Sequence, residues 1–319
     1  MGAFSTNFMQ IVGKLRESRY QAILGAIIMA VIILAVKPEV LLEGIQRSSL
    51  YAVIALPMAL ILGIVGIINL AHGDFMMLGS YLAYWFAVKS GLDPLLAMIP
   101  AMLAFFLIGI LTFYALIKPV LGSQELNQLL LTFGLALVLE EAANLSFTSA
   151  PLKLSVPYVS ASLTIGDLTF GTFEFVYVLA AILVFYIISL FLKKTRIGRA
   201  ARAVGQNPKG AKLVGIDVNK TYLIIFSLSI AIIGTIGVLF AMRHSVFPIM
   251  GAPYTMKSFC LIAMAGIGNI TGILWYSALL GVSESIITAI PGAAGWADLV
   301  FFALIVGAIL IRSYQQRVK

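Results

Sequence analysis

Charged side chains and cysteine are scarce in this 319-residue chain. Only 11% of its residues are charged, 61% are hydrophobic, and the mean hydropathy is +1.05. Soluble domains carry about 25% charged residues, so the composition excludes an ordinary soluble protein. The single cysteine, Cys260, excludes an intrachain disulfide and leaves the redox compartment open.

Sequence motifs for nucleotide chemistry, metal binding and catalysis are also missing. No G-x-x-x-x-G-K-[ST] phosphate-binding loop occurs. The two histidines, His72 and His244, have no cysteine nearby that would complete a metal site. No Ser-His-Asp arrangement accompanies His72. We therefore expect no metal, no cofactor and no catalytic residue in this chain.

Long apolar runs are what the sequence does contain, and they predict an all-α, polytopic membrane protein. The runs are continuous rather than alternating, which favours helices over a β-barrel. We place the membrane segments at 21–36, 48–69, 73–89, 95–117, 126–148, 173–192, 221–242, 257–267, 271–290 and 297–312.

Two of these ten segments, 73–89 and 257–267, are short for a crossing of about 20 residues. We interpret them as half-helices or broken helices, and eight crossings with two paired re-entrant segments remain the alternative. The first segment, 21–36, has a second interpretation as the apolar region of a signal peptide, although no small-x-small cleavage pattern follows it.

The net charge of +8 is concentrated in three short segments rather than spread along the chain. The N-terminal tail, the loop at 193–220 and the C-terminal tail are basic, and the positive-inside rule places all three in the cytoplasm. This distribution needs no nucleic-acid partner. The chain reads as one transmembrane domain over 1–319, with both termini cytoplasmic. The segment 149–172 then lies outside, where alternating apolar residues at 152–158 predict short strands or extended structure.

A glycine-rich stretch from Gly63 to Gly79 carries Asn69, His72 and Asp74 between two apolar segments. Ionisable groups are costly in hydrocarbon and usually face a bundle interior or a water-filled path. One interpretation is therefore a break in the helices that lines a translocation path. The other is a surface loop in which Asp74 is the N-cap of a helix starting at Phe75.

A second break carries Gly266, Gly268 and Asn269 between two apolar segments. Paired breaks in the two halves of a transporter indicate the substrate path. The candidate path residues are Asn69, His72, Asp74, Gly266, Gly268 and Asn269. A polar set at Glu140, Glu141 and Asn144 within an apolar segment is open to either a functional or a purely structural interpretation.

The basic loop at 193–220 also contains start and stop signals for two short helices. The stretch 198–204 reads as an amphipathic helix, Asn207 and Pro208 read as N-cap and first residue of another, and Gly215 is placed to end it. The positive-inside rule accounts for basic residues in the loop, but it does not account for two short helices with a stop between them. The two helices therefore predict a docking surface for a cytoplasmic partner. The candidate residues are Gly198, Arg199, Arg202, Asn207, Pro208 and Lys212.

Residues 69–81 resemble the N-[FLM]-A-H-G-[ED]-x-x-M-[LI]-G-[AS]-Y signature of branched-chain amino-acid ABC transporter permeases. The loop 195–216 resembles the ATPase-coupling segment of the same family. Residues 265–272 resemble its G-G-x-G-[ST]-x-x-G stretch, from which Ala265 and Asn269 depart. The combination is closer to the LivH than to the LivM type.

This resemblance implies a multi-pass permease subunit of an ABC importer in the bacterial inner membrane, which moves branched-chain amino acids into the cytoplasm. The implied partners are a second homologous or identical permease, two ATP-binding subunits that hold ATP and Mg²⁺, a periplasmic or extracellular solute-binding protein, and membrane lipid. The chain itself would not be an enzyme. Three alternatives stay open: a urea or amide permease of the same family, a secondary transporter with His72 and Asp74 in proton coupling, and an intramembrane enzyme, for which no catalytic set is visible.

Overall fold

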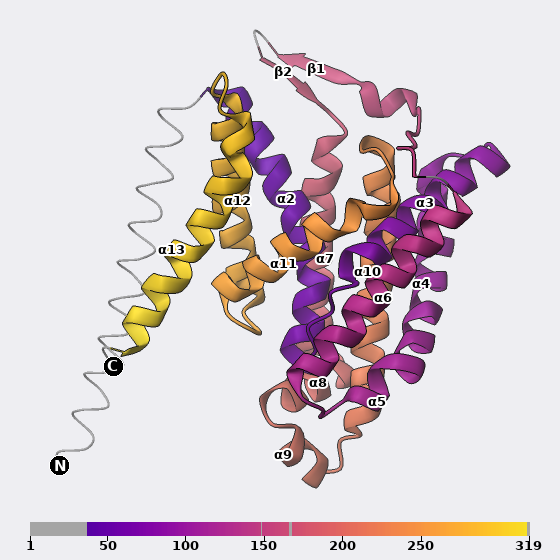
Figure 1. Cartoon of the computed structure of the whole chain (residues 1–319), viewed down its shortest axis with the longest axis vertical. Coiled ribbons are helices and arrows are strands. Elements are labelled where there is room, and N and C mark those ends of the chain that lie inside the picture. Colours follow the sequence, from indigo (N-terminus) through magenta and orange to yellow (C-terminus); the bar gives the residue numbers. More distant parts are fainter. Residues whose placement is uncertain (1–36, 148, 166–167, 318–319) are drawn as a thin grey trace.

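The computed structural model describes residues 37–147, 149–165 and 168–317, and it is a bundle of helices with one small hairpin at its end (Figure 1). The elements are α2 (Pro38–Leu60), η1 (Ile61–Val65), α3 (His72–Ser90), η2 (Pro94–Ala97), α4 (Met98–Thr112), η3 (Phe113–Ile117), α5 (Lys118–Val120), α6 (Glu125–Ser146), η4 (Pro157–Ser160), β1 (Ser162–Ile165), β2 (Leu168–Gly171), α7 (Glu174–Lys194), α8 (Arg196–Gln206), α9 (Pro208–Leu213), α10 (Val218–Arg243), η5 (Pro248–Met250), α11 (Gly251–Ala265), α12 (Ile270–Ala289), η6 (Ala294–Trp296) and α13 (Ala297–Arg317). The all-α class is confirmed, whereas the predicted segment 21–36 and the basic N-terminal tail lie outside the described residues.

Six of the described helices are long and apolar enough to cross a membrane: α2 with η1, α4 with its flanking turns, α6, α7, α10 and α12. The helices α3, of 19 residues, and α11, of 15 residues, do not meet that criterion, so whether they cross fully is not decided by it. Ten crossings therefore stay a prediction.

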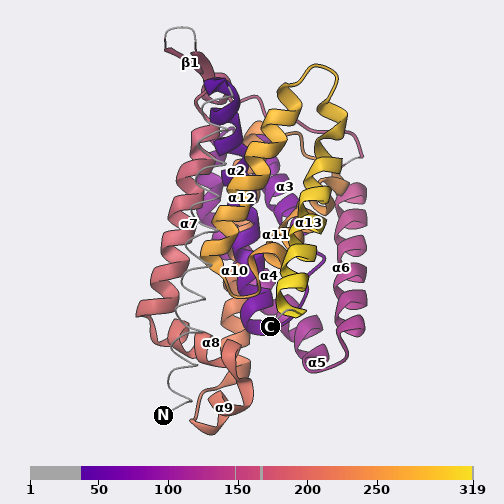
Figure 2. The same ribbon diagram turned by 90° about the vertical axis from the view of Figure 1, so that its left-hand side faces the viewer.

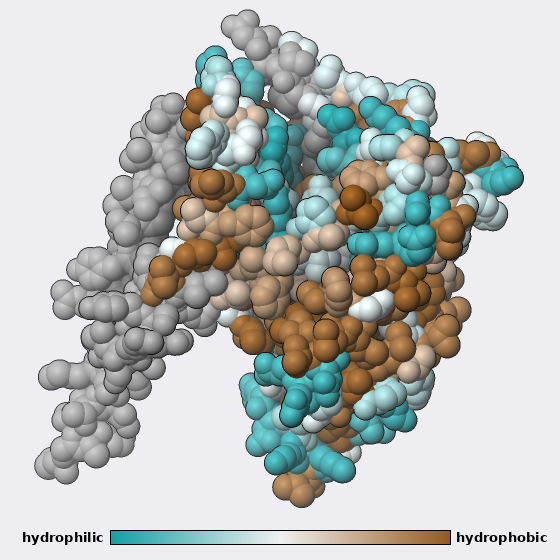
Figure 3. Space-filling view, in the orientation of Figure 1, coloured by the Kyte–Doolittle hydropathy of each residue, from teal (hydrophilic) through white to brown (hydrophobic). Residues whose placement is uncertain are grey.

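Two helices form the core. In their most apolar windows, α2 with η1 is 78% buried and α10 is 72% buried, against 17–39% for the other four. Helix α2 packs on α12 and α7, while α10 packs on α3 and α4. The outer helices present apolar side chains outward, and Figure 3 shows a hydrophobic band across the helical body with hydrophilic surface above and below it. This is the pattern of a bundle surrounded by lipid.

The predicted start of the second segment is wrong, and its helical structure ends four residues before the predicted residue 69. Helix α2 begins at Pro38 rather than at 48, and it takes in Glu43 and Arg47, whose charges lower the local hydropathy. These two side chains pair one helical turn apart, at 2.6 Å, which satisfies them within the helix. Helical structure ends at Val65 rather than at 69, because Gly66 takes a left-handed backbone conformation with φ +77°. Helix α11 likewise begins before the predicted residue 257, at Gly251.

The segment between α6 and α7 contains the expected strands, but not where the alternation placed them. Strands β1 and β2 pair antiparallel, with Ser162 opposite Gly171. The alternating stretch instead makes a single bridge from Leu152 to Val246 before Pro157 opens a 3₁₀ turn. The hairpin lies at one end of the bundle and α8 and α9 lie at the other (Figures 1 and 2).

Candidate functional site

The first break runs from the π-helical turn η1 (Ile61–Val65) through residues 66–71 to the first turn of α3, and its polar side chains are buried. Asn69 is 1% exposed, His72 is fully buried and Asp74 is 1% exposed. Ala71, rather than Asp74, is the N-cap of α3, so the N-cap prediction is wrong. Asp74 is instead in the first turn of α3, where a carboxylate interacts favourably with the positive end of the helix dipole.

Several polar atoms of this break have no hydrogen-bond partner among the described residues. His72 Nε2 lies 2.9 Å from the carbonyl oxygen of Ile54 on α2. Because a carbonyl only accepts, Nε2 carries the proton and Nδ1 is the unpartnered acceptor. Both side-chain polar atoms of Asn69 and Oδ1 of Asp74 are also unpartnered. Buried polar groups normally have hydrogen-bond partners, so this break is a buried polar site that suits water or a polar solute.

Close backbone packing holds the start of α3 against the start of α11. A Cβ on Gly73 would overlap the carbonyl oxygen of Gly251, and the Gly73 N–H donates to Thr255 Oγ1 over 2.8 Å. Small residues allow membrane helices to approach this closely. Helix α3, which follows the first break, is thus fixed to helix α11, which precedes the second.

The second break lies between α11 and α12 and is capped. Gly266 and Gly268 have φ values of +87° and +82°. The Asn269 side chain accepts from the Gly272 N–H at 2.9 Å and donates to the Ala265 carbonyl at 3.1 Å. Asn269 therefore holds the break in shape as the N-cap of α12.

The structure brings the two breaks together through glycine. A Cβ on Gly63, in the π-helical end of the α2 segment, would lie 3.3 Å from the Gly268 Cα. The contact is made by Gly63 rather than by the polar residues at 69–74. A Cβ on Gly268 itself would meet nothing within 4 Å, so that face of the break is open.

Helices α8 and α9 confirm the predicted helix-stop-helix arrangement. Thr195 and Asn207 are the N-caps, each accepting from a backbone N–H three residues on at 2.9 Å, and Pro208 is the first residue of α9. Helix α8 begins at Arg196, two residues before the predicted Gly198. Arg199, Arg202 and Lys212 are exposed.

Two features of this region were not anticipated from the sequence. Leu213, the last residue of α9, is 89% exposed, and Val214, which follows it, is 77% exposed. The other end of the region reaches the first break, because a Cβ on Gly205 of α8 would lie 2.9 Å from the Gly63 carbonyl oxygen. Helix α8 therefore touches the residue that in turn touches the second break.

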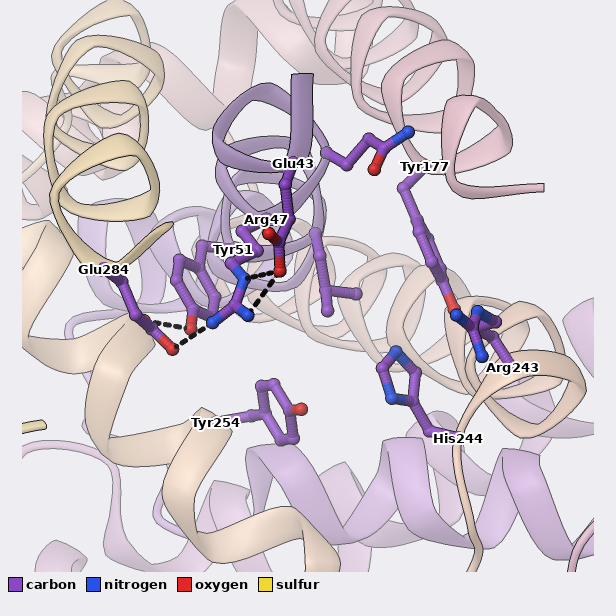
Figure 4. Close-up of a pocket in the computed structure, with 10 residues that line it drawn as sticks. Glu43, Arg47, Tyr51, Tyr177, Arg243, His244, Tyr254 and Glu284 are labelled. Carbon is purple, nitrogen blue, oxygen red and sulfur yellow. Dashed lines mark hydrogen bonds and ion pairs between the residues drawn. The ribbon is translucent and has the colours of Figure 1, made fainter. Parts of the chain in front are cut away.

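A charged cluster near the hairpin end was also missed. Glu284 on α12 accepts from Arg47 on α2 at 3.1 Å and from Tyr51 at 2.5 Å, and it pairs with Lys257 on α11 at 3.3 Å (Figure 4 shows Glu284 with Arg47 and Tyr51). Lys257 and Glu284 lie within apolar segments. Ionisable residues inside membrane segments are functional candidates by default. Their position in apolar segments is therefore the sequence signal from which Lys257 and Glu284 could have been predicted.

Among the described residues, the polar set on α6 makes no hydrogen bond to either break, although the Glu140 carboxylate is close enough to Asp74 to interact with it electrostatically. Glu141 is exposed and accepts from the Asn144 side chain at 3.4 Å. Glu140 and Glu141 instead line a separate pocket of about 520 Å³ at the end of α6, beside Pro248.

Comparison with known proteins gives consistent relatives over nearly the whole chain. The family described as "Branched-chain amino acid transport system / permease component" matches residues 40–309. The high-affinity branched-chain amino acid transport system permease protein BraD of Pseudomonas aeruginosa is 29% identical over 285 residues, which cover 85% of this chain and 92% of BraD. The corresponding protein LivH of Escherichia coli K12 is 27% identical over 295 residues, covering 84% and 91%. The fructose import permease protein FrcC of Rhizobium meliloti is 24% identical over 339 residues, covering 100% and 93%. No solved structure matches.

Proposed function

The chain belongs to the branched-chain amino acid transport system permease family, and we propose that branched-chain amino acids are its own substrates. It is a LivH-type permease component of an ABC importer and a multi-pass membrane protein. The proposal of substrate rests on BraD and LivH, because FrcC, at lower identity, is a fructose permease.

The contact between the two breaks supports the translocation role most directly. Non-helical backbone at membrane depth is tolerated only where protein or water satisfies its polar groups. Here one break holds the unpartnered polar atoms of Asn69, His72 and Asp74, and the other presents the open face of Gly268. Paired broken helices that meet inside a bundle are typical of a transporter's substrate path.

The energy for transport would enter through α8 and α9. We propose that a separate ATP-binding subunit docks there, with the exposed apolar side chains of Leu213 and Val214 at the centre of the contact and Arg199, Arg202 and Lys212 around it. Movement of α8 would reach the path directly, because Gly205 packs on Gly63 and Gly63 packs on Gly268. Two such ATPases and a second permease would complete the transporter, with ATP and Mg²⁺ bound outside this chain.

The two ends of the bundle would face opposite compartments of a bacterial inner membrane. The α8–α9 end and both termini are rich in lysine and arginine, and we assign all three to the cytoplasm by the positive-inside rule. The hairpin end would then face the solute-binding protein. In a Cys260→Ala background, Ser160→Cys should react with a membrane-impermeant thiol reagent in intact cells, whereas Lys209→Cys and Gln316→Cys should not. The reverse labelling would refute this orientation.

Reconstitution tests the proposed function. The chain, its partner permease and the ATPases in proteoliposomes, with the solute-binding protein outside, should take up leucine, isoleucine and valine only with ATP inside. Arg199→Glu combined with Arg202→Glu should abolish uptake and ATPase recovery in a pull-down, while Lys153→Glu, on the hairpin side, should change neither. Uptake of fructose or urea but not of leucine would contradict the proposed substrate. Unchanged recovery of the ATPase with the double variant would contradict the proposal that α8 and α9 form its docking surface.

A further inference from the structure

A pocket of about 380 Å³ opens between α2, α7, the end of α10, α11 and α12, away from both breaks (Figure 4). This volume is at the small end of the range for ligand sites. The pocket belongs to the hairpin end of the bundle, since Gln46 on its wall donates to the Gly171 carbonyl of β2 at 3.4 Å. In the orientation proposed above, a solute arriving from outside meets this pocket before it meets the breaks.

One wall of the pocket carries the carboxylates of Glu43 and Glu284, which are held in place by ion pairs with Arg47, also on the wall, and with Lys257. Glu284 is only 10% exposed at its side chain, and Arg47 and Lys257 fix its carboxylate from two sides. Glu43 accepts both of its contacts from Arg47 through one oxygen, Oε1, which leaves Oε2 for another donor. Figure 3 shows hydrophilic side chains gathered in this region between α12 and α2.

The opposite wall is basic. Arg243, the last residue of α10, and the adjacent His244 lie across the open centre of the pocket from Glu43 and Glu284 (Figure 4). Arg243 and Glu43 are exposed, whereas the Glu284 side chain is only 10% exposed. Opposite charges on facing walls complement a ligand that carries both signs at once.

The remaining lining suits an apolar side chain. Leu50, Tyr177 and Tyr254 contribute apolar and aromatic surface between the two charged walls. Tyr254 is held by an edge-to-face contact with Phe240, whose ring centroid is 5.1 Å away. Rigid aromatic rings provide apolar contact area at a small cost in side-chain entropy.

We propose that this pocket is a receiving site for a zwitterionic α-amino acid. The ligand's ammonium group faces Glu43 and Glu284, its carboxylate faces Arg243, and its side chain lies along Leu50 and Tyr254. The inference rests on the proposed function and adds a recognition site in the permease itself, apart from the two breaks. Charge-assisted hydrogen bonds to both poles distinguish an amino acid from a neutral sugar or amide of similar size.

Equilibrium binding to the purified transporter complex in lipid nanodiscs, without nucleotide or solute-binding protein, tests the site. The probe is radiolabelled leucine, and the competitors are leucinamide, which lacks the carboxylate, and 4-methylpentanoate, which lacks the ammonium group. We expect each competitor to bind at least about tenfold more weakly than leucine, because each forfeits one charged wall.

Substitutions then assign each wall. Arg243→Gln should weaken leucine binding and reduce the difference in affinity between leucine and leucinamide. Glu43→Gln should instead reduce the difference in affinity between leucine and 4-methylpentanoate. Loss of packing alone would not produce these opposite changes in preference. Glu43 and Arg243 are both solvent-accessible, so the variants should fold. Lys153→Gln and Glu125→Gln, exposed charges elsewhere on the chain, are the matched controls and should leave binding unchanged.

Three outcomes would overturn the proposal: no leucine binding to the wild-type complex, competition by leucinamide and 4-methylpentanoate as strong as that by unlabelled leucine, or unchanged preference among these compounds in both variants. ATP-dependent leucine uptake by the same preparation is measured in parallel. Uptake without binding in this pocket would refute the site and leave the proposed function standing, whereas binding without uptake of leucine would contradict the proposed function.

Discussion

The break before α3 is enclosed and unsatisfied, whereas the break before α12 is open and satisfied. At the first, Asn69, His72 and Asp74 are almost fully buried and retain unpartnered polar atoms. At the second, Ile267 is 67% exposed and Asn269 completes its own helix cap. Glycine and asparagine between apolar segments thus give two different structures. The first is a tightly packed, buried polar site, and the second is an exposed turn fixed by its own helix cap.

The difference suggests a division of labour. The first break is fixed by its neighbours, since α3 packs on α11 without intervening side chains at Gly73 and Gly251. The second is fixed by its own cap and leaves free space beside Gly268. Substitutions at the first should therefore act mainly on folding, and substitutions at the second mainly on transport.

Gly73→Ala should have the largest effect on stability. The new methyl group would overlap the backbone of Gly251, which has no flexible end to move aside, so we expect a loss of about 3 kcal/mol. Gly134→Ala on α6 is the control, because a Cβ there meets nothing within 4 Å. Thermal unfolding of the purified complex in detergent measures both. Equal unfolding temperatures for the two variants would refute the close α3–α11 contact.

His72→Ala and Asn269→Ala compare the polar groups of the two breaks. Removing the buried imidazole leaves a cavity and takes away its hydrogen bond to the Ile54 carbonyl, for an expected loss of about 2 kcal/mol. Removing the exposed cap of α12 should cost about 1 kcal/mol. The same unfolding assay ranks them. A larger loss for Asn269→Ala would show that the first break is not the one on which folding depends.

Gly268→Leu should lower leucine uptake at least about tenfold while the complex still assembles, because a large side chain would fill the open space beside the break; such a fall in rate corresponds to about 1.4 kcal/mol. Gly122→Leu, between α5 and α6, carries the same backbone strain, with φ +81° against +82°, and also points into open space. It should transport normally. If both variants lose uptake equally, backbone strain rather than obstruction is the cause.

Local signals in the sequence predicted the α8–α9 region and the positions of both breaks. Asn207 followed by Pro208 marks a helix start through its own chemistry, and the glycines at 266 and 268 mark a break through their left-handed conformations. None of these features needs a distant partner. They could therefore be read from neighbouring residues alone.

Features that depend on distant partners could not be predicted in this way. Arg47 pairs with Glu284, 237 residues away, and that pairing helps to keep a charged first half of α2 helical. The sequence alone places the start of the segment at 48, because nothing in it shows that the charges at 43 and 47 have partners. The contact of Gly73 with Gly251 and the relay from Gly205 through Gly63 to Gly268 likewise exist only once the helices are packed.

A reversible cross-link between the breaks tests the central claim, that the two breaks meet at Gly63 and Gly268 and that their movement transports solute. In a Cys260→Ala background, Gly63→Cys with Gly268→Cys should cross-link on mild oxidation, and each single variant should not. We predict that ATP-driven leucine uptake by the cross-linked complex falls at least about tenfold and returns when the bond is reduced. Failure to cross-link, or uptake that is unaffected by the cross-link, would contradict the account.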